Sequence, residues 1–535
     1  MNEKQEQNQN LKMVENALGR HVPTEIPGLG KFEPYVAPFA YLHRELFAPA
    51  REKSRLIRPK EPRHDKVTDD IRKAVERSGL ENGMTISFHH HLRNGDAVIP
   101  TILKTLWEMG FQNLSLAPSS LPDSHDMVAD YFRNGLVSRL FSSGARGEVG
   151  KAISRGELEI PVLLRSHGGR ARAVEQGDLP IDVAFLAAPL CDKYGNMTGS
   201  GGRSACGSLG YAQVDARYAR HVIAVTDDLA DYPLRPRISV PQYLVDQVLV
   251  VDSIGDPSRI ATGAARISRN PVDLCIARNA FDLIAASGLL TDGCSFQVGA
   301  GGASLAVAAY VKDYMAENHV KGGFGLGGMS GYMIEMLEQG YFEAMFDVQS
   351  FDKSVTDSMT RNANHMEIDV SCYANPFNKG CVAHNLDIVV LAALDIDVDF
   401  NVNIQTGHDG VLRGAIGGHP DTSAGAKLAV IVAPSFRGGV PTVKESVTTI
   451  CTPGETVDAF VTERGICINP RREDLLESAR AARLPIKDIR ELKEEVEKLT
   501  GVPDLPEFDR NRVVAVVENR DGTLLDSVYR VKSEK

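Results

Sequence analysis

Two glycine clusters in this sequence combine residue types and spacing that could bind negative charge. The first contains Gly299, Gly301 and Gly302, and the second contains Gly327 and Gly328. Each cluster follows a short apolar run and precedes a segment of helical character, which predicts strand, tight turn and helix twice in succession. Glycine lets a ligand approach the backbone, and helix N-termini attract anions. We therefore expect a phosphate, carboxylate or oxyanion site at these five glycines; tight strand–helix packing without a ligand is the alternative.

A polar turn over 89–95, which begins with three consecutive histidines, follows an expected strand over 83–88. Consecutive histidines in one turn cannot easily all face one metal ion. We therefore favour binding of a substrate carboxylate by His90, Arg93 and Asn94, with a solvated or internally satisfied loop as the alternative. The eight cysteines lie singly, without a C-x-x-C pair, which is typical of reduced core thiols and not of disulfides or a zinc site.

Composition and charge restrict the class of protein. The chain has 535 residues, a hydrophobic fraction of 43%, a charged fraction of 24% and a formal net charge of −11. These values are ordinary for a globular protein of two or three domains, and the negative balance argues against nucleic-acid binding. The longest apolar runs, such as 388–394, are too short to span a bilayer. The polar N-terminus lacks the apolar core of a signal peptide, so we expect a cytoplasmic protein.

Segments of strand and helix character alternate from residue 65 onward, which predicts an α/β fold with mostly parallel sheets. The two halves of the chain also resemble each other. Asp182-Val-Ala-Phe and Asp397-Val-Asp-Phe are each followed by a Gly-Gly pair, 19 residues later in one half and 20 in the other. This repeat predicts a duplicated domain, with a site between the copies.

The sequence divides into an extended arm over 1–65, a first α/β domain over 66–235 and a second over 236–535. Prolines punctuate the arm, and its basic segment over 51–63 is either solvated or binds an anionic partner. A helix over 472–483, a charged helix over 487–498 and a β-hairpin end the second domain. The Asp521-Gly522 pair predicts the turn of that hairpin.

Common nucleotide-binding and hydrolase motifs are missing from this sequence. Ser304 stands where the third glycine of a G-x-G-x-x-G motif belongs. There is no Gly-Lys-Ser/Thr phosphate loop, no G-x-S-x-G nucleophile elbow and no H-E-x-x-H zinc motif. The glycine clusters therefore need another explanation.

Five segments, in order, resemble the CoA-transferase superfamily and, within it, the citrate lyase α-subunit family. They are Gly83–Phe88 with Asn94–Asp96, Asp182–Phe185 with Asp192–Asn196, Gln297–Gly302, Gly417–Asp421 and Val461–Gly465. The long arm and the terminal helix-plus-hairpin favour the citrate lyase α type, over the chain from about residue 30 to its end. The resemblance implies two tandem, duplicated CoA-transferase-like (NagB/RpiA-like) domains.

The resemblance also implies an acyl exchange on a carrier thioester, in which citrate and acetyl-carrier give citryl-carrier and acetate. Many relatives carry a nucleophilic glutamate at the position that Gly325–Met329 occupies here, and Glu335 falls inside the following helix. We therefore expect a mixed anhydride and no covalent enzyme intermediate. Backbone N–H groups of the five glycines would stabilise the oxyanions.

Binding roles follow from the same resemblance. Arg93, Arg146 and Arg203 lie beside expected turns and would hold citrate, because guanidinium binds carboxylate bidentately. The carrier or CoA arm would bind at Gly417, Gly418, His419 and Asp421. Helix capping is the alternative role for Asp421.

No permanently bound cofactor is implied, since the acyl carrier (gamma) subunit supplies a CoA-like phosphopantetheine arm for which acetyl-CoA is a surrogate. Expected partners are this carrier and the citryl lyase (beta) subunit, in a larger complex that contains a homo-oligomer of this chain. Two alternatives remain open. One is an acetate-type CoA-transferase or acyl-CoA hydrolase, and the other is a non-catalytic assembly subunit.

Overall fold

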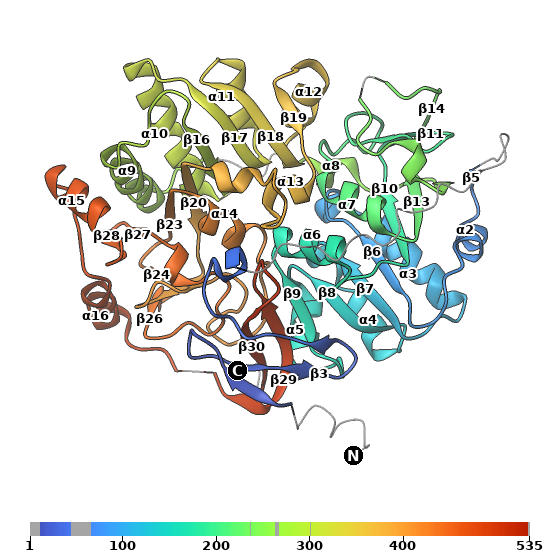
Figure 1. Cartoon of the computed structure of the whole chain (residues 1–535), viewed down its shortest axis with the longest axis horizontal. Coiled ribbons are helices and arrows are strands. Elements are labelled where there is room, and N and C mark those ends of the chain that lie inside the picture. Colours follow the sequence, from blue (N-terminus) through green and yellow to red (C-terminus); the bar gives the residue numbers. More distant parts are fainter. Residues whose placement is uncertain are drawn as a thin grey trace.

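Two large, mostly parallel β-sheets form the framework of the protein (Figure 1). The computed structural model describes residues 11–43, 66–235, 237–262, 267–299, 301–504 and 506–532. The basic segment 51–63 lies outside these residues.

The first sheet has ten strands in the order β30-β29-β9-β8-β7-β6-β10-β13-β15-β5, and only its β29–β30 pair is antiparallel. Its strands are β5 (Val67–Thr68), β6 (Thr85–Phe88), β7 (Leu114–Pro118), β8 (Val137–Ser142), β9 (Val162–Arg165), β10 (Val183–Ala187), β13 (His221–Thr226), β15 (Gln247–Val250), β29 (Phe508–Glu518) and β30 (Leu524–Val531). The fold class expected from the alternating sequence pattern is confirmed.

The second sheet has eight strands in the order β19-β18-β17-β16-β20-β23-β27-β28, and only its β27–β28 pair is antiparallel. Its strands are β16 (Ser295–Val298), β17 (Gly322–Met329), β18 (Phe342–Ser350), β19 (His365–Glu367), β20 (Ile388–Ala392), β23 (Leu428–Val432), β27 (Ala459–Thr462) and β28 (Gly465–Ile468). Below, "first half" means the part from β5 to β15, and "second half" means the part from β16 to β28.

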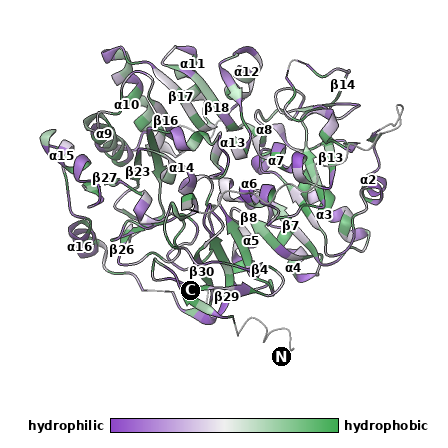
Figure 2. Ribbon diagram, viewed as in Figure 1, coloured by the Kyte–Doolittle hydropathy of each residue, from purple (hydrophilic) through white to green (hydrophobic). Residues whose placement is uncertain are grey.

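Helices cover the sheets, and α6, α7, α13 and α14 lie between them (Figure 1). The helices are α2 (Ile71–Ser78), α3 (Val98–Glu108), α4 (Val128–Arg133), α5 (Gly147–Ser154), α6 (His167–Gln176), α7 (Gly210–Tyr218), α8 (Pro257–Ile260), α9 (Pro271–Ala286), α10 (Gly302–Asn318), α11 (Gly331–Glu338), α12 (Lys353–Arg361), α13 (Val370–Ala374), α14 (His419–Gly425), α15 (Glu473–Ala481) and α16 (Ile489–Thr500). Figure 2 shows hydrophobic sheet strands and hydrophilic outer helices such as α2 and α16, as burial of a core requires. Among the described residues, no helix combines the length and apolarity needed to cross a membrane.

Strand order shows that the two halves are copies of one fold. The order β9-β8-β7-β6-β10-β13-β15 matches β19-β18-β17-β16-β20-β23-β27. Each copy also carries a small three-stranded sheet with the same pairing. These sheets are β12 (Met197–Thr198), β11 (Leu190–Asp192) and β14 (Leu229–Ala230) in the first half, and β22 (Val402–Asn403), β21 (Asp395–Asp397) and β26 (Val443–Lys444) in the second.

The equivalent aspartates differ from the pair expected in the sequence repeat. Asp182 corresponds to Asp387 and not to Asp397, because each precedes the equivalent strand, β10 or β20. The Asp182 carboxylate accepts the Thr85 N–H at 2.9 Å, and the Asp387 carboxylate accepts the Ser295 N–H at 2.8 Å. The motifs at Asp182 and Asp397 are therefore ten residues out of register with the structural repeat.

Sheet membership also differs from the expected division at residue 235. Strand β15 belongs to the first sheet, and so does the C-terminal hairpin β29–β30, which had been placed with the second domain. The hairpin forms as Asp521-Gly522 predicted, and β29 pairs in parallel with β9 through residues 515–518. It thereby covers an edge that would otherwise expose unpaired backbone groups.

The described part of the arm, residues 11–43, consists of short strands that pack on the hairpin. They are β1 (Met13–Glu15), β2 (His21–Pro23), β3 (Glu25–Ile26) and β4 (Gly30–Lys31). The Asn16 amide donates to the Leu524 and Leu525 carbonyls at 3.1 and 2.8 Å, and the Tyr35 N–H donates to Leu524 at 3.0 Å. A remaining small hairpin in the second half is β24 (Phe436–Arg437) with β25 (Val440–Pro441).

The second glycine cluster is a strand and not the turn that the sequence predicted. Residues 322–329 form β17 between β16 and β18, with a bulge between Gly327 and Gly328. Both neighbouring strands hydrogen-bond to this segment. Its glycines therefore allow other side chains to pack closely against the strand. A side chain on Gly322 would overlap the Phe342 ring, and one on Gly325 would overlap Met345.

Candidate functional site

The carboxyl ends of the strands in both sheets bring polar side chains to the region between the sheets. We call this region the inter-sheet site. Its members are His90, Ser119, His167 and Tyr211 from the first half and Gln297, Gln349 and Tyr373 from the second. Ligand sites in parallel α/β folds form at this end of the strands and between domains.

His90 is held at both ring nitrogens by residues of different halves. Its backbone N–H donates to Ser119 Oγ at 3.0 Å, and its Nδ1 lies 2.5 Å from the same oxygen. Nε2 lies 3.2 Å from Gln349 Oε1, which can only accept, so the ring proton is on Nε2 and Nδ1 accepts the Ser119 hydroxyl proton. Burial, with a further contribution from His167, holds the pKa of His90 well below its usual value. His90 is thus a neutral, oriented ring that joins the two halves.

His89 and His91 stack on each other at a centroid distance of 6.0 Å, whereas His90 packs against His167 and Tyr211, so the three consecutive histidines do not form one cluster. His89 Nε2 lies 3.4 Å from the Asp215 carboxylate, which also binds Arg170. His91 Nε2 lies 3.1 Å from the Ala187 carbonyl. Both side chains are buried.

His167 and Tyr211 pack against His90. The His167 ring stacks on His90 at a centroid distance of 5.4 Å, and Tyr211 lies 4.7 Å from each of the two histidine rings. Burial lowers the pKa of His167 to about 3, and it raises the pKa of Tyr211 well above its usual value. Near pH 7 the three packed rings are therefore uncharged.

Asp421 clamps the two residues that flank His167. Its carboxylate accepts hydrogen bonds from Ser166 Oγ and the Gly168 N–H, both at 2.9 Å, and lies 3.7 Å from Arg520 of the hairpin turn. Burial raises the pKa of Asp421 to about 6. The sequence predicts that Asp421 binds the carrier arm or caps the helix after Thr422. In the structure its carboxylate is fully enclosed and caps α6 instead.

Gly417 and Gly418 face residues of the inter-sheet site. The Gly417 carbonyl accepts the His167 N–H at 2.8 Å, and its own N–H donates to Ser143 Oγ at 2.8 Å. A side chain on Gly418 would overlap the Tyr373 hydroxyl. These two glycines therefore supply space beside His167 and Tyr373.

Gly327 and Gly328 lie next to side chains that connect them to the inter-sheet site. Gly327 has a φ of +113°, and a Cβ at this position would lie 3.0–3.2 Å from the end of the Gln297 side chain. Gln297 Nε2 donates to the Tyr373 hydroxyl at 3.1 Å. A side chain on Gly328 would overlap the Phe351 ring.

Arg93 also packs on Phe351, with its guanidinium 4.7 Å from the ring centroid. Burial lowers the pKa of Arg93, Asp352 opposes that effect, and the nearby Arg146 adds to it. Arg93 thus places a cation at the junction of the two halves. Arg146 precedes α5 as an exposed side chain, and Asn94 is also exposed.

Three other groups of expected site residues have different surroundings. The Gly299 N–H donates to the Val390 carbonyl at 2.9 Å, so the sheet already uses this expected oxyanion donor. Gly301 and Gly302 begin α10, where Gly302 contacts Ser268. Arg203 is exposed and donates to the Asp227 carbonyl. The ring nitrogens of His419 lie 2.7 Å from Thr452 Oγ1 and 3.2 Å from the Ala392 carbonyl, so both nitrogens already have partners within the protein.

Sequence reasoning missed Ser119, His167, Tyr211, Gln349 and Tyr373. A usable signal existed for two of them. Ser119 directly follows β7, and His167 follows β9 after Ser166, which caps the Gly168-Gly169 start of α6. Of the other three, Tyr211 lies in α7, Gln349 in β18 and Tyr373 in α13, and no local pattern marks them.

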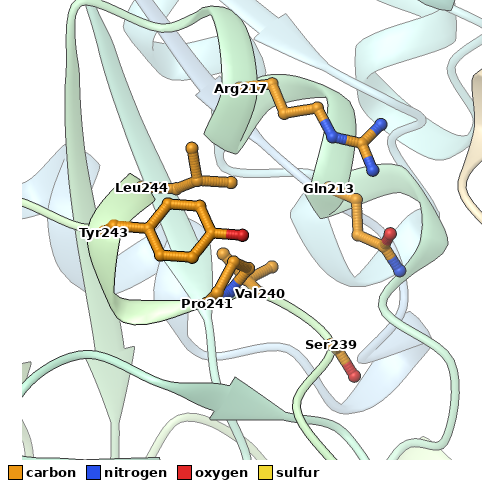
Figure 3. A pocket seen from close by; sticks show the side chains of 7 residues that line it. All are labelled: Gln213, Arg217, Ser239, Val240, Pro241, Tyr243 and Leu244. Atoms are coloured by element: carbon orange, nitrogen blue, oxygen red, sulfur yellow. The ribbon is translucent and has the colours of Figure 1, made fainter.

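A separate surface pocket of about 350 Å³ lies beside α7 (Figure 3). Gln213 and Arg217 of α7 face Tyr243 and Leu244 across it. Because successive helical residues are about 100° apart, these residues lie on the side of α7 away from Tyr211. This pocket is distinct from the inter-sheet site.

Known proteins share this fold and much of this sequence. The model of the family described as citrate lyase, alpha subunit, matches residues 64–531. The citrate lyase alpha chain of Klebsiella pneumoniae is 48% identical over 473 residues, covering 88% of this chain and 93% of that protein. The alpha chain of Haemophilus influenzae is 48% identical over 467 residues, covering 87% and 93%.

A solved structure described as the alpha subunit of citrate lyase from Streptococcus mutans, in complex with citrate, superposes with a TM-score of 0.91. It is 46% identical and covers 97% of this chain and 100% of its own. A Pseudomonas malonate decarboxylase hetero-tetramer shares the fold alone, with a TM-score of 0.59, 17% identity and coverage of 82% of this chain and 88% of its own. The fold is CoA-transferase-like. The chain belongs to the citrate lyase alpha-subunit family.

Proposed function

We propose that this chain is the transferase subunit that exchanges acetyl for citryl on a carrier thioester. Citrate and acetyl-carrier are the substrates, and citryl-carrier and acetate are the products. Membership of the citrate lyase alpha-subunit family and the similarity to a structure that contains citrate support this proposal. The observation that carries it is a cation, Arg93, placed beside a group of uncharged hydrogen-bonding side chains between two sheets.

The chemistry proceeds in two acyl transfers. A citrate carboxylate attacks the acetyl thioester, the C–S bond breaks, and a mixed anhydride and a thiolate form. The thiolate then attacks the citryl carbonyl of the anhydride, and acetate leaves. One thioester replaces another, so the protein needs to supply position and hydrogen-bond donors only.

A direct transfer without an enzyme-bound acyl group fits the residues near β17. The segment 322–334 contains no Asp or Glu. Glu335 lies on the exposed side of α11, where its carboxylate binds Lys312 at 2.7 Å. The carboxylate that covalent relatives would use is therefore missing from this position.

The proposal includes the partners. The phosphopantetheine arm of an acyl carrier (gamma) subunit would bring the thioester, and a citryl lyase (beta) subunit would cleave citryl-carrier. The carrier arm acts as a substrate and not as a resident cofactor. We place these reactions in the cytoplasm, in a complex that contains several copies of this chain.

Mass spectrometry of this chain with acetyl-CoA and citrate tests the proposal. Formation of citryl-CoA and acetate together, with no mass added to the protein, is the expected result. A protein adduct from acetyl-CoA alone would instead support an acetate-type CoA-transferase with a covalent nucleophile. Release of acetate and CoA without citrate would mean a hydrolase. No reaction after addition of carrier and lyase chains would favour an assembly subunit.

A further inference from the structure

His167 has unused hydrogen-bonding capacity in the inter-sheet site. Among the described residues, neither ring nitrogen has a hydrogen-bond partner, and only Nδ1 is fully enclosed. Nε2 points toward Gly417, where a Cβ would lie 3.8 Å away. The ring is half-buried, so Nε2 is the nitrogen that a ligand can reach.

The proton of the neutral ring belongs on this accessible nitrogen. Burial and Arg170 keep the pKa of His167 at about 3, so one nitrogen carries hydrogen at neutral pH. An enclosed N–H without an acceptor is rarer and costlier than an enclosed lone pair. Nδ1 therefore accepts nothing, and Nε2 presents an N–H toward the site.

Tyr211 offers a second donor beside His167. Its ring is buried, yet its hydroxyl has no hydrogen-bond partner among the residues that the structure describes and is not fully enclosed. The ring lies edge-on to His167, with 4.7 Å between centroids. His90, fixed by Ser119 and Gln349, packs against both rings and limits their movement.

Backbone N–H groups at the start of α6 are already used. The His167 N–H donates to Gly417, the Gly168 N–H to Asp421 and the Gly169 N–H to Ser166. This helix terminus is therefore no free anion site, and the side chains are the donors that remain.

We propose that His167 Nε2–H and the Tyr211 hydroxyl donate hydrogen bonds to the carbonyl oxygen of the acyl group in transfer. This inference rests on the proposed function. Citrate carboxylates are charged before and during the reaction, and Arg93 suits them. A thioester carbonyl is neutral in the ground state and gains charge only as the thiolate or carboxylate attacks. Neutral, oriented donors therefore favour the transition state over the bound substrate.

The test uses His167→Leu, His167→Gln, Tyr211→Phe and, as a matched control, Tyr243→Phe. Tyr243 lines the pocket of Figure 3 and its side chain is 78% exposed. We measure kcat and KM for citrate in citryl-CoA formation from acetyl-CoA by the full chain. His167→Leu and Tyr211→Phe should each lower kcat by about 100-fold while KM for citrate changes less than about threefold, since one oxyanion donor contributes about that factor.

His167→Gln retains an amide donor near the Nε2 position and should recover at least about tenfold of the loss in His167→Leu. Tyr243→Phe should match the wild type. The wild-type kcat should also be level from about pH 7 to 8, above the pKa of about 6 of Asp421, since neither donor titrates there. A kcat that falls as pH rises through about 6.5 in Asp421→Asn as well as in the wild type would mean a charged histidine and would overturn the inference.

The outcomes separate this inference from the proposed function. A wild-type chain that forms no citryl-CoA, even with its partner chains, contradicts the proposed function. A wild-type chain that transfers normally, with His167→Leu and Tyr211→Phe within threefold of it, overturns the inference alone. A rise in KM with unchanged kcat also overturns it, because the donors would then bind substrate and transition state equally.

Discussion

Equivalent strands in the two halves end in different chemistry. The strand β6 ends at a histidine turn, whereas its copy β16 ends at a glycine turn; β9 leads to His167, and its copy β19 leads to Val370 at the start of α13. The first half contributes two histidine rings and Tyr211 to the inter-sheet site, whereas the second half contributes two glutamine amides, Tyr373 and glycines. Gly417 of the second half leaves room for the His167 ring of the first half. In this duplicated fold, one copy therefore provides the bulky side chain and the other provides the space for it.

The C-terminal hairpin is a second difference between the halves. It extends the first sheet beyond β9, whereas the equivalent strand β19 lies at the end of the second sheet. The hairpin turn also carries Arg520, which lies 3.7 Å from Asp421. Asp421 in turn accepts hydrogen bonds from Ser166 and Gly168, the neighbours of His167. The first half therefore depends on the last residues of the chain for both its edge and its site.

The largest effect is expected from Glu518→Ala, which breaks the attachment of the hairpin. Glu518 binds Arg165 at 2.8 Å and Arg172 at 2.7 Å, and all three side chains are buried. Loss of the carboxylate leaves the buried Arg165 guanidinium unpaired and leaves Arg172 with Asp178 as its remaining acidic partner, so the free energy of unfolding should fall by about 3–5 kcal/mol. Chemical denaturation measures this free energy of unfolding. Asp509→Ala, which removes the half-buried partner of the exposed Arg530, should cost less than about 1 kcal/mol.

The next effect concerns the clamp on His167 and depends on pH. Burial raises the pKa of Asp421 to about 6 from its ordinary 3.8. The folded state thus prefers the protonated carboxyl, and this stabilisation is present below about pH 4 and lost as pH rises through 6.

Asp421→Asn does not titrate. Its free energy of unfolding, measured relative to the wild type, should therefore increase by up to about 3 kcal/mol from pH 4 to pH 7. Thermal or denaturant unfolding at several pH values gives this difference. A constant offset between the two proteins across that range would contradict the prediction.

Gly327→Ala tests the contribution of the second half to the site. A non-glycine residue at a φ of +113° is strained, and its Cβ would press on Gln297. Displacement of Gln297 also releases Tyr373, so we expect about a 100-fold loss of citryl-CoA formation. Gly380→Ala, at a position without positive φ and with its nearest neighbour at 3.4 Å, is the matched control. Equal activity of the two variants would show that the β17 bulge is dispensable.

Gln349→Leu weakens the link between the halves more modestly. It leaves the His90 Nε2–H without its acceptor, which should lower the free energy of unfolding by about 1–2 kcal/mol. Gln339→Leu removes an exposed amide that binds Glu335 on α11 and should change stability by less than about 0.5 kcal/mol. Parallel denaturation of both variants measures the difference. Equal stabilities would mean that the halves are held together without this hydrogen bond.

The smallest effect is expected from Glu335→Gln. Its carboxylate lies on the outer side of α11 with Lys312, so citryl-CoA formation should change less than about twofold. A complete loss of transfer in this variant, together with a protein adduct in the wild type, would restore a covalent glutamate.

Local sequence patterns determined the elements of this protein. The sequence pattern predicted the strand over 83–88, found at 85–88, and Asp521-Gly522 predicted the hairpin turn, because each depends on neighbouring residues only. Five short motifs in order identified the family, which the family model over 64–531 confirms. The roles of the individual site residues stay predictions.

Tertiary structure decided which of these elements meet. Glu518 binds Arg165 across 353 positions, Asp421 binds Ser166 across 255, and His90 binds Gln349 across 259. No local pattern encodes such pairs, because each forms only after two sheets have folded and packed. For the same reason the hairpin joined the first sheet, Asp421 became a clamp on His167, and the second glycine cluster became a strand. The sequence supplied the polar groups, and packing decided which of them remained without a partner and open to a substrate.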